Sequence, residues 1–480
     1  MKKQNITEHI THKIMQFAAQ TSYEHLEEAT VMQLKRHLLD SVASMIWATG
    51  QPTVHKLLKQ VQQLQPEGVC PVPVIGTTGV DRAAQVFTLL NRYPDFMDNF
   101  IGKDATCHPS DNIGAILAAA QWINAGGREV LISMATAYQI QCTLIEQMPV
   151  MAKGIDHTAL LACSITAALS PLLSLTEEQG AHAIGIAAST FNTTVTSRAS
   201  YTYEWKGYAS SLVALGCMQI VLLARNGVTG PLAYFEGPMG FEEEFDMKAA
   251  FKNEKRDLSR IPRCILKSYN AEVHTQSAIE ALLELRSQLN AEERQQVAGI
   301  SLTTFLTAYH ITGGGKYGDR KHVATKEQAD HSLPYLLAVA WLDGQVMPEQ
   351  LMPERIRSAD VQALLQKVEV DTVLPLKTPR KLAEKIDPYT IAYPEKLEAK
   401  VKITLDDGRI WHHKKDDFTG FHTRPLSWEQ VVSKFRQLTI SAIDTDLQDK
   451  IIDLISTFDH QKAADLVKLL CQVPAKLSAS

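Results

Sequence analysis

The chain has 480 residues and a formal net charge of −5, with 45% hydrophobic and 21% charged residues, which is close to the globular average. This composition excludes a disordered or fibrous chain, and the length predicts two or three domains around a large core. No block of lysine and arginine interrupts the sequence, so we expect neither a nucleic-acid nor an anionic-membrane partner.

The cysteines and the N-terminal segment favour a reducing compartment. The chain has seven cysteines, an odd number, and none of them forms a CxxC pair. This usage predicts neither a disulfide framework nor a zinc site. The first residues are basic, but no apolar core of a signal peptide follows them, so we expect a cytoplasmic protein.

The first half of the chain predicts a succession of apolar helices. Helical periodicity is clear over residues 34–46, 113–123, 157–170 and 210–224, and Thr176-Glu177-Glu178-Gln179 forms a capping box before a further helix. The pair Gly126-Gly127 is expected to end the second of these helices. The apolar run at 160–175 is interrupted by polar residues and is shorter than the ~20 residues of a membrane span, which favours a core helix.

Helices that are apolar nearly all round must cover one another. Residues 1–267 are therefore predicted to form a large all-helical domain, and the fold class is mainly α. Residues 418–480 return to helical periodicity and are expected to pack back on this domain.

Between these two regions the pattern changes to a smaller α+β domain, residues 268–417. Residues 300–307 and 399–405 alternate with period two and are rich in β-branched side chains, which predicts strands. Asp406-Asp407-Gly408 predicts a hairpin turn into a strand at 409–412, and residues 328–342 are expected to be helical.

The common nucleotide and hydrolase motifs are absent from the sequence. It contains no phosphate-binding loop, no strand-bound GxGxxG, no GxSxG and no HExxH. What remains is four polar clusters in apolar surroundings, and each has a structural alternative.

The segment from Asp95 to Ser110 places acids and His108 between two apolar helices, either as a loop with helix caps or as the rim of a pocket. His157 begins an apolar helix, whose N-terminal N–H groups suit an anion, but a capping histidine is also common. Lys206 before an apolar helix is either a solvated lysine or an anion clamp. His274 lies at the domain boundary, where ligand clefts are frequent.

In their order along the chain, these segments resemble the MmgE/PrpD family. The resemblance covers residues 10–440. His331 belongs to one of the matching motifs, and we expect this histidine to be structural. The strings that carry it are His108-Pro109-Ser110-Asp111-Asn112-Ile113-Gly114, Gly154-Ile155-Asp156-His157, Trp205-Lys206-Gly207, Asn270-Ala271-Glu272-Val273-His274-Thr275-Gln276 and Asp330-His331-Ser332 followed by Tyr335.

The resemblance implies a helical domain with an α+β lid, a homodimer, and an active site between the domains. The positions that match the family's catalytic residues are Asp95, His108, His157, Lys206 and His274. Asn99 stands where relatives often have threonine, and we expect it to bind substrate together with Lys206 and His157. Asp98 offers a second acid close to Asp95. The residues before Lys206 differ from the arginine-rich stretch associated with the dehydratases.

The activity implied by the resemblance is a hydro-lyase reaction on a tricarboxylate: dehydration of 2-methylcitrate to 2-methyl-cis-aconitate in propionate catabolism. Decarboxylation of cis-aconitate to itaconate is the close alternative, and a non-catalytic small-acid binder is a third. Dehydration needs a base for a C–H beside a carboxylate and an acid for the departing hydroxyl.

We expect His108 and His274 to transfer protons, with acid and base left unassigned between them. Lys206 and the helix start at His157 would hold carboxylates, and Asp95 would orient a histidine or stabilise its charge. No cysteines are grouped as ligands of an iron–sulfur cluster, so we expect no cofactor and no metal.

Overall fold

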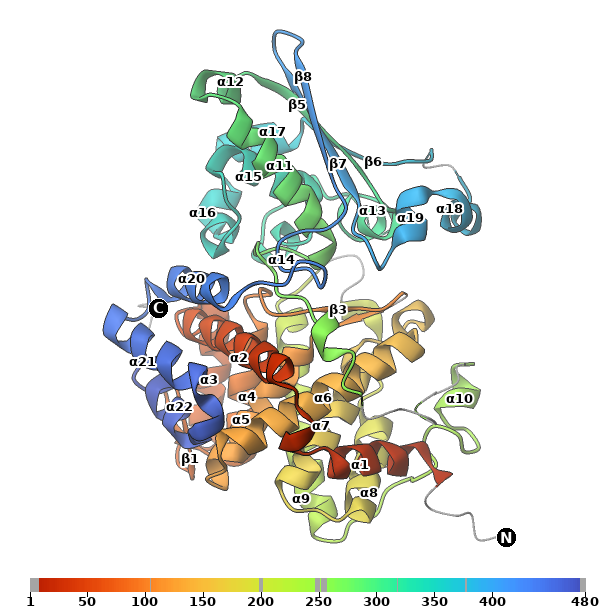
Figure 1. Cartoon of the computed structure of the whole chain (residues 1–480), viewed down its shortest axis with the longest axis vertical. Coiled ribbons are helices and arrows are strands. Elements are labelled where there is room, and N and C mark those ends of the chain that lie inside the picture. The colour runs from red at the N-terminus through yellow and green to blue at the C-terminus, as the bar shows by residue number, and fades with distance from the viewer. Residues whose placement is uncertain are drawn as a thin grey trace. The chain divides into compact units, whose positions relative to one another are not determined.

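The computed structural model describes residues 8–103, 105–197, 202–246, 251, 257–316, 318–375 and 378–474, most of them in helices (Figure 1). The predicted mainly α class is confirmed. The chain forms two compact units. Unit 1 takes the described residues up to Thr196, then Trp205–Cys264 and those from Ser427 onward, whereas unit 2 takes a short segment ending at Glu204 and Ile265–Leu426.

Unit 1 is helical apart from two short strand pairs. Its helices are α1 (Ile10–Gln20), α2 (Glu28–Ala48), α3 (Pro52–Leu64), α4 (Val80–Arg92), α5 (Ile113–Trp122), α6 (Gly127–Gln147), α7 (Thr158–Leu172), α8 (Glu177–Thr190), α9 (Trp205–Arg225), α10 (Phe241–Glu244), α20 (Trp428–Thr439), α21 (Thr445–Ser456) and α22 (Ala463–Leu470). The strand pairs are β1 (Cys70–Val72) with β2 (Gly76–Thr78) and β3 (Phe100–Ile101) with β4 (Thr106–Cys107), both antiparallel.

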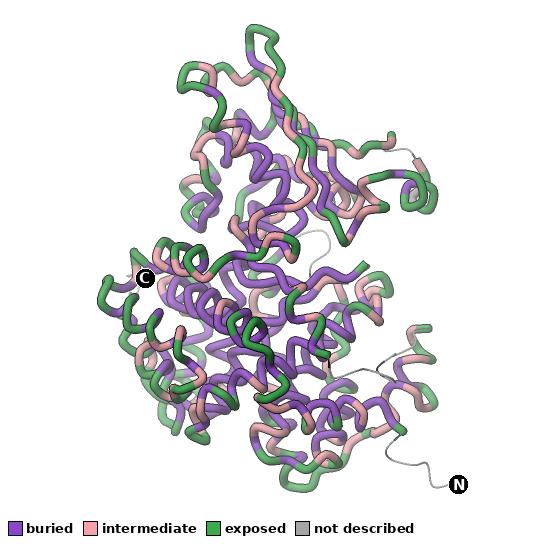
Figure 2. The backbone as a smooth tube through the Cα atoms, viewed as in Figure 1, coloured by how far each residue is buried: buried purple, intermediate pink, exposed green. Residues whose placement is uncertain are grey.

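The core of unit 1 lies among helices that have almost no polar face. Ile113 to Ala120 of α5 and Thr158 to Ser170 of α7 are all buried, and Figure 2 colours these central segments accordingly. Because a helix apolar on all sides is stable only when other helices surround it, α5 and α7 take interior positions. Among the C-terminal helices, α20 packs on α2 and α22 packs on α5.

The predicted helices of this half lie within α2, α5, α7, α8 and α9. The capping box is confirmed: Gln179 N–H donates to Thr176 Oγ1 at 3.2 Å, and Thr176 N–H donates to Gln179 Oε1 at 3.0 Å. As predicted, the preceding helix α5 ends before the pair Gly126-Gly127, at Trp122, and α6 begins at Gly127. A Cβ on Gly127 would lie 1.7 Å from the carbonyl oxygen of Phe458, so packing rather than chain termination requires this glycine.

Among the described helices, α9 is the one that is long and apolar enough to cross a bilayer, by length and composition only. It packs against α4, α7 and α8, and 61% of its most apolar window is buried. These contacts indicate a core helix.

Unit 2 combines short helices with one sheet. The elements in chain order are α11 (Gln276–Gln288), α12 (Ala291–Gln295), β5 (Val297–Thr304), α13 (Leu306–Thr312), α14 (Lys326–Ala329), α15 (Leu333–Asp343), α16 (Pro353–Ile356), α17 (Ala359–Leu365), β6 (Val368–Thr372), α18 (Arg380–Ile386), α19 (Pro388–Ala392), β7 (Ala399–Leu405) and β8 (Ile410–Lys415).

The sheet of unit 2 has four strands in the order β6-β5-β7-β8 (Figure 1). β6 is parallel to β5, while β7 is antiparallel to both β5 and β8. Alternate residues of β5 and β7, including Ile300, Leu302, Val401 and Ile403, are buried in the same core as α11 and α15. This alternation is the pattern of a sheet with one face covered by helices.

Two boundaries in unit 2 differ from the sequence prediction. The strand expected over 300–307 ends at Thr304, and Leu306 begins α13. The helix expected over 328–342 is split into α14 and α15, because the Ser332 hydroxyl accepts a hydrogen bond from Tyr335 N–H at 3.1 Å and starts a new helix there.

The close approach of α4 and α5 depends on Gly114 in the first turn of α5. A Cβ at this position would lie 2.3 Å from the backbone nitrogen of Thr88 in α4. The neighbouring helix backbone cannot move away without separating the two helices. Gly114 therefore permits the short distance between α5 and α4, the helix that carries Arg92.

We expect Gly114→Ala to lower the free energy of unfolding by about 1–3 kcal/mol, because the added methyl overpacks a helix crossing. The matched control is Gly50→Ala, where a Cβ meets only the carbonyl oxygen of Trp47 at 3.8 Å. Urea unfolding of both variants measures the difference. Equal unfolding midpoints for the two variants would contradict the proposed packing role.

Candidate active site

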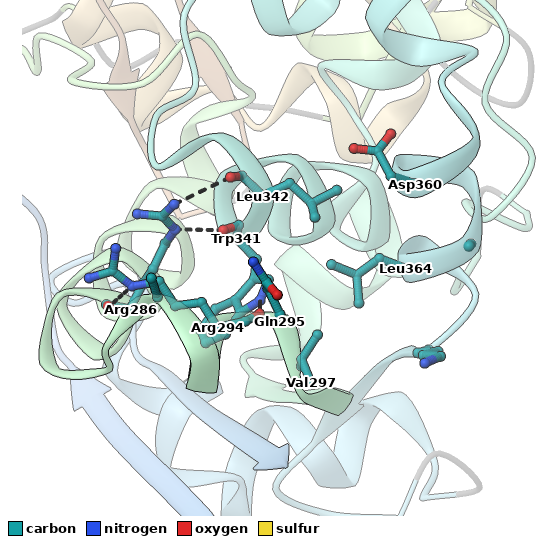
Figure 3. A pocket seen from close by; sticks show the side chains of 11 residues that line it. Arg286, Arg294, Gln295, Val297, Trp341, Leu342, Asp360 and Leu364 are labelled. Atoms are coloured by element: carbon teal, nitrogen blue, oxygen red, sulfur yellow. Dashed lines mark hydrogen bonds between the residues drawn. The ribbon is translucent and has the colours of Figure 1, made fainter. Parts of the chain in front are cut away.

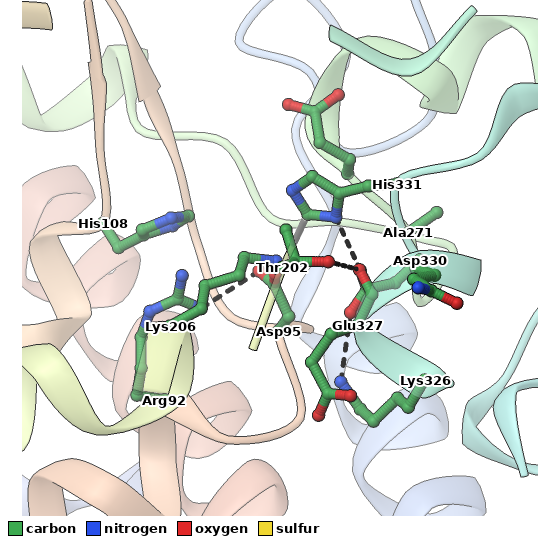
Figure 4. Close-up of polar contacts among 12 residues, drawn as sticks. Arg92, Asp95, His108, Thr202, Lys206, Ala271, Lys326, Glu327, Asp330 and His331 are labelled. Carbon is green, nitrogen blue, oxygen red and sulfur yellow. Dashed lines mark hydrogen bonds and ion pairs between the residues drawn. The ribbon is translucent and has the colours of Figure 1, made fainter. Parts of the chain in front are cut away.

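Asp95 follows the C-terminus of α4 in a left-handed backbone conformation, with φ of 57°. Such a conformation is uncommon for a residue other than glycine, and aspartate tolerates it better than most. The turn directs the carboxylate toward two cations (Figure 4). Lys206 Nζ lies 2.6 Å from Asp95 Oδ2, and Arg92 Nη1 lies 3.0 Å from Asp95 Oδ1.

Lys206 is the second residue of α9, which packs along α4. Its side chain is 6% exposed and that of Asp95 is 7% exposed. Burial at this level demands a partner for each charge. Asp111, fully buried, extends the cluster: Ser210 Oγ donates to Asp111 Oδ2 at 2.6 Å, and Arg92 Nε lies 3.8 Å from the same oxygen. The positive charges of Arg92 and Lys206 thus offset the negative charges of two carboxylates, Asp95 and Asp111, in the interior.

Asp98 has a structural position rather than one beside Lys206. His37 Nδ1 lies 2.8 Å from Asp98 Oδ2, and Ser110 N–H donates to Asp98 Oδ1 at 2.9 Å. Burial and the nearby Asp98 charge raise the pKa of the Tyr138 hydroxyl well above its usual value. Asp98 therefore holds in place the segment between α4 and β3. Asp95 is the acid that pairs with Lys206.

The segment that carries Asp95 is also held from the C-terminal end of the chain. Lys434 of α20 donates to the carbonyl oxygen of Phe96 at 3.0 Å, and its ammonium lies 3.7 Å from the Phe96 ring centroid. Asp40 completes this contact at 2.7 Å from Lys434 Nζ. Burial raises the pKa of the Asp40 carboxyl, although Lys434 and His37 act in the opposite direction.

His108 is oriented by a backbone acceptor. Its Nδ1 lies 2.8 Å from the carbonyl oxygen of Asp98. Because a carbonyl oxygen only accepts, Nδ1 carries the proton and the neutral ring has its lone pair on Nε2. His108 can therefore take a proton at Nε2 when neutral and return one when charged.

His157 lies against His108, with ring centroids 5.3 Å apart in an edge-to-face arrangement. It is the N-cap residue of α7, which begins at Thr158, one residue after the expected helix start at His157, and it is 2% exposed. Asp156 accepts the N–H of Thr158 at 2.9 Å and thereby caps the helix. The two imidazoles adjoin the positive end of the α7 dipole.

Asn99 is also buried, at 2% exposure. Its side-chain oxygen accepts no hydrogen bond from the described part of the chain. Buried polar atoms almost always have a partner, and Asn99 shares this exception with other buried groups such as Ser41 and Ser44.

In unit 2, His274 belongs to a line of three hydrogen-bonded side chains. Its Nδ1 lies 2.7 Å from Glu272 Oε1, and its Nε2 lies 3.1 Å from the hydroxyl of Tyr393. Glu272 also accepts the backbone N–H of His274 at 2.8 Å. Burial raises the pKa of Glu272, but the charges of His274, His331 and Lys267 and the bond to His274 outweigh it, so the pKa is lowered.

A second carboxylate–imidazole pair lies beside the first within unit 2. Asp330 Oδ1 lies 2.5 Å from His331 Nδ1, and Asp330 Oδ2 lies 3.1 Å from Lys326 Nζ (Figure 4). The backbone N–H of Glu272 donates to the carbonyl oxygen of Asp330 at 2.9 Å. The Asp330-His331 motif thus holds the position of Glu272.

The structure brings the sequence-predicted residues together in two groups. Asp95 pairs with Lys206, and His108 pairs with His157, all in unit 1. His274 lies in unit 2, so its predicted convergence with the other four stays a prediction.

Sequence reasoning assigned no role to four residues that complete these groups, namely Arg92, His37, Glu272 and Tyr393. One of them had a sequence signal, since Glu272 stands two residues before His274 in a quoted motif. The other three carried no signal in the sequence.

The buried cysteines keep their protons. Burial raises the pKa of the Cys142 and Cys264 thiols well above the usual value and also raises that of Cys107. The sulfurs of Cys142 and Cys264 lie 3.7 Å apart. A cysteine binds a metal as a thiolate. The raised pKa values keep these three buried side chains in the thiol form, as part of the core.

Unit 2 also has an open hollow of about 510 Å³, shown in Figure 3. It is lined by Arg286, Ala291, Arg294, Gln295, Val297, Trp341, Leu342, Asp360, Ala363, Leu364 and Lys367. Arg286 donates there to the carbonyl oxygens of Trp341 and Leu342 and so caps the C-terminus of α15. This hollow is at the C-terminal end of α11, whereas His274 precedes its N-terminus, roughly 18 Å away by helix rise.

Comparison of the sequence with known proteins identifies its family. The MmgE/PrpD N-terminal domain matches residues 12–254, and the MmgE/PrpD C-terminal domain matches residues 269–460. The 2-methylcitrate dehydratase of Escherichia coli O157:H7 is 27% identical over 449 residues, which cover 87% of each chain.

Two further relatives have similar identities. The 2-methylcitrate dehydratase of Cupriavidus necator is 28% identical over 328 residues, covering 64% of this chain and 66% of the relative. Alkylcitrate dehydratase phiI of a fungal species is 27% identical over 371 residues, covering 73% and 71%. Since the two domain models together span most of its length, the chain belongs to the MmgE/PrpD family.

Proposed function

We propose that this protein is a hydro-lyase that dehydrates 2-methylcitrate to 2-methyl-cis-aconitate by acid/base chemistry without a cofactor. The family and the names of its relatives support a dehydratase. The observation that carries the proposal is the pairing of a buried Asp95–Lys206 cluster with two adjacent imidazoles, His108 and His157, in unit 1.

The chemistry follows from these groups. A C–H next to a carboxylate loses its proton only if the charge that develops on that carboxylate is stabilised. Asp95 keeps Lys206 charged in a buried position, where an ammonium acts more strongly on an anion than it does in water. His108 can exchange a proton at Nε2 as either acid or base, and His157 adjoins it at the start of α7.

Asn99 supports substrate binding. An amide oxygen can accept a hydrogen bond from a substrate hydroxyl, as the threonine common at this position in relatives also can. The buried, unpartnered Oδ1 of Asn99 fits the hydroxyl that leaves as water.

The substrate experiment uses 2-methylcitrate and cis-aconitate in parallel. We expect the purified protein to produce double-bond absorbance from 2-methylcitrate and to release no CO₂ from cis-aconitate. Iron analysis of the same active sample should show far less than one iron per chain. CO₂ release as the faster reaction would replace the proposal with a decarboxylase, and stoichiometric iron would contradict cofactor-independent chemistry.

The Asp95–Lys206 pair permits a test that separates stability from turnover. Lys206→Met removes the nearer of the two cations beside the buried Asp95 carboxylate, so we expect a loss of about 3 kcal/mol in the free energy of unfolding together with loss of turnover. Adding Asp95→Asn removes the carboxylate charge as well and should restore most of the stability, whereas turnover stays lost. Urea unfolding and the dehydration assay measure the two effects, and an active double variant would refute the role of Lys206.

The proposal includes a homodimer, supported by a stripe of exposed apolar residues on α9. Trp205, Leu212 and Leu223 are 50%, 41% and 50% exposed, and their spacing of 7 and 11 residues puts them on the same face of the helix.

We expect Leu212→Glu to convert the dimer to a monomer in light scattering, because the charge would be buried at the interface. The control is Ile440→Glu, at a residue that is 75% exposed, and it should leave the dimer intact. A monomeric wild-type protein at micromolar concentration would rule out the dimer.

A further inference from the structure

The line Glu272–His274–Tyr393 has a definite direction of hydrogen bonding. Glu272 accepts the backbone N–H of His274 at 2.8 Å and lies 2.7 Å from its Nδ1, and a carboxylate only accepts, so His274 donates from Nδ1. The neutral ring then has its lone pair on Nε2, which accepts the hydroxyl proton of Tyr393. This is the order of groups that activates a hydroxyl oxygen in a carboxylate–imidazole–hydroxyl triad.

His274 itself is poorly placed to touch a substrate. Its side chain is 1% exposed, and both ring nitrogens are engaged, by Glu272 and by Tyr393. Phe305 packs on it with ring centroids 5.7 Å apart, and Phe305 also stacks on Tyr393 at 5.2 Å and 19°. An atom that exchanges a proton with His274 therefore does so through the hydroxyl of Tyr393.

Resting on the proposed function, we infer that Tyr393 is a catalytic residue of the dehydration and that His274 acts on the substrate through it. The Tyr393 oxygen takes the proton from the substrate C–H as its own proton passes to His274 Nε2. The C–H electron pair stays on the substrate and expels the hydroxyl, which leaves as water with a proton from a separate acid. Glu272 stabilises the imidazolium that forms, and the imidazolium then passes its proton back to the Tyr393 oxygen as that hydroxyl releases the substrate proton to solvent.

This assignment divides the roles in unit 2. Tyr393 exchanges the proton, His274 is the internal base, and Glu272 is a positioning residue that fixes the tautomer of His274 and balances its charge. The other charged groups that act on Glu272 are His331 and Lys267. Nothing in the sequence separates Tyr393 from the other tyrosines, since it lies 119 residues from His274 along the chain.

The first test is a double-mutant cycle of Tyr393→Phe and His274→Gln. Tyr393→Phe keeps the ring that stacks on Phe305, so the fold should persist, and we expect kcat to fall a hundredfold or more while KM changes little. His274→Gln should cause a loss of similar size, and the double variant should be no slower than the slower single variant. Multiplying losses in the double variant would show that the two residues act independently and would overturn the inference.

The matched control is Tyr389→Phe, since Tyr389 lies four residues earlier in α19 with its ring beneath Lys414 Nζ at 4.8 Å. We expect it to keep wild-type turnover. A wild-type enzyme that converts neither acid contradicts the proposed function. Wild-type turnover that survives Tyr393→Phe contradicts this inference alone.

The pH profile tests the part played by Glu272. In Glu272→Gln the imidazolium of His274 loses its counter-charge, so we expect the acidic limb of kcat/KM to move to lower pH by about one unit, with a reduced plateau. Glu272→Asp should restore part of the shift because it keeps the charge. A lower plateau with an unmoved limb would mean that Glu272 only supports the fold, and would remove it from the triad.

Discussion

The buried charges between α4, α5 and α9 impose the strongest constraint on unit 1. Arg92, Asp95, Asp111 and Lys206 are all removed from water, and each buried ion costs several kcal/mol unless its partner is correctly placed. The three helices must therefore meet at fixed distances, and Gly114 permits one of these approaches. The same requirement holds the Lys206 ammonium against the Asp95 carboxylate in a low-dielectric position.

A second feature common to both units is that neighbours set the chemistry of each histidine. A backbone carbonyl fixes the tautomer of His108, and the Glu272 carboxylate fixes that of His274. Imidazole chemistry depends on which nitrogen carries the proton. The neighbours of each ring, here the Asp98 carbonyl and the Glu272 carboxylate, therefore set which nitrogen of the histidine carries the proton.

Much of the secondary structure was predictable because the signals are local. The capping box at Thr176 and the alternation in β7 each need only a few adjacent residues, and both are present as expected. A distant contact, in contrast, adds a constraint that no local pattern contains. A side chain at Gly127 would collide with the Phe458 carbonyl oxygen, and no pattern around Gly127 contains that information.

The sequence by itself determined the mainly helical class and the order of the motifs that mark the family, because periodicity, caps and short strings are written in neighbouring residues. Only the tertiary structure decided which side chains meet. Asp95 and Lys206 are 111 residues apart, and His274 and Tyr393 are 119 apart. Ion pairs and hydrogen bonds act over a few ångströms, so these partners exist only after packing has brought distant segments together.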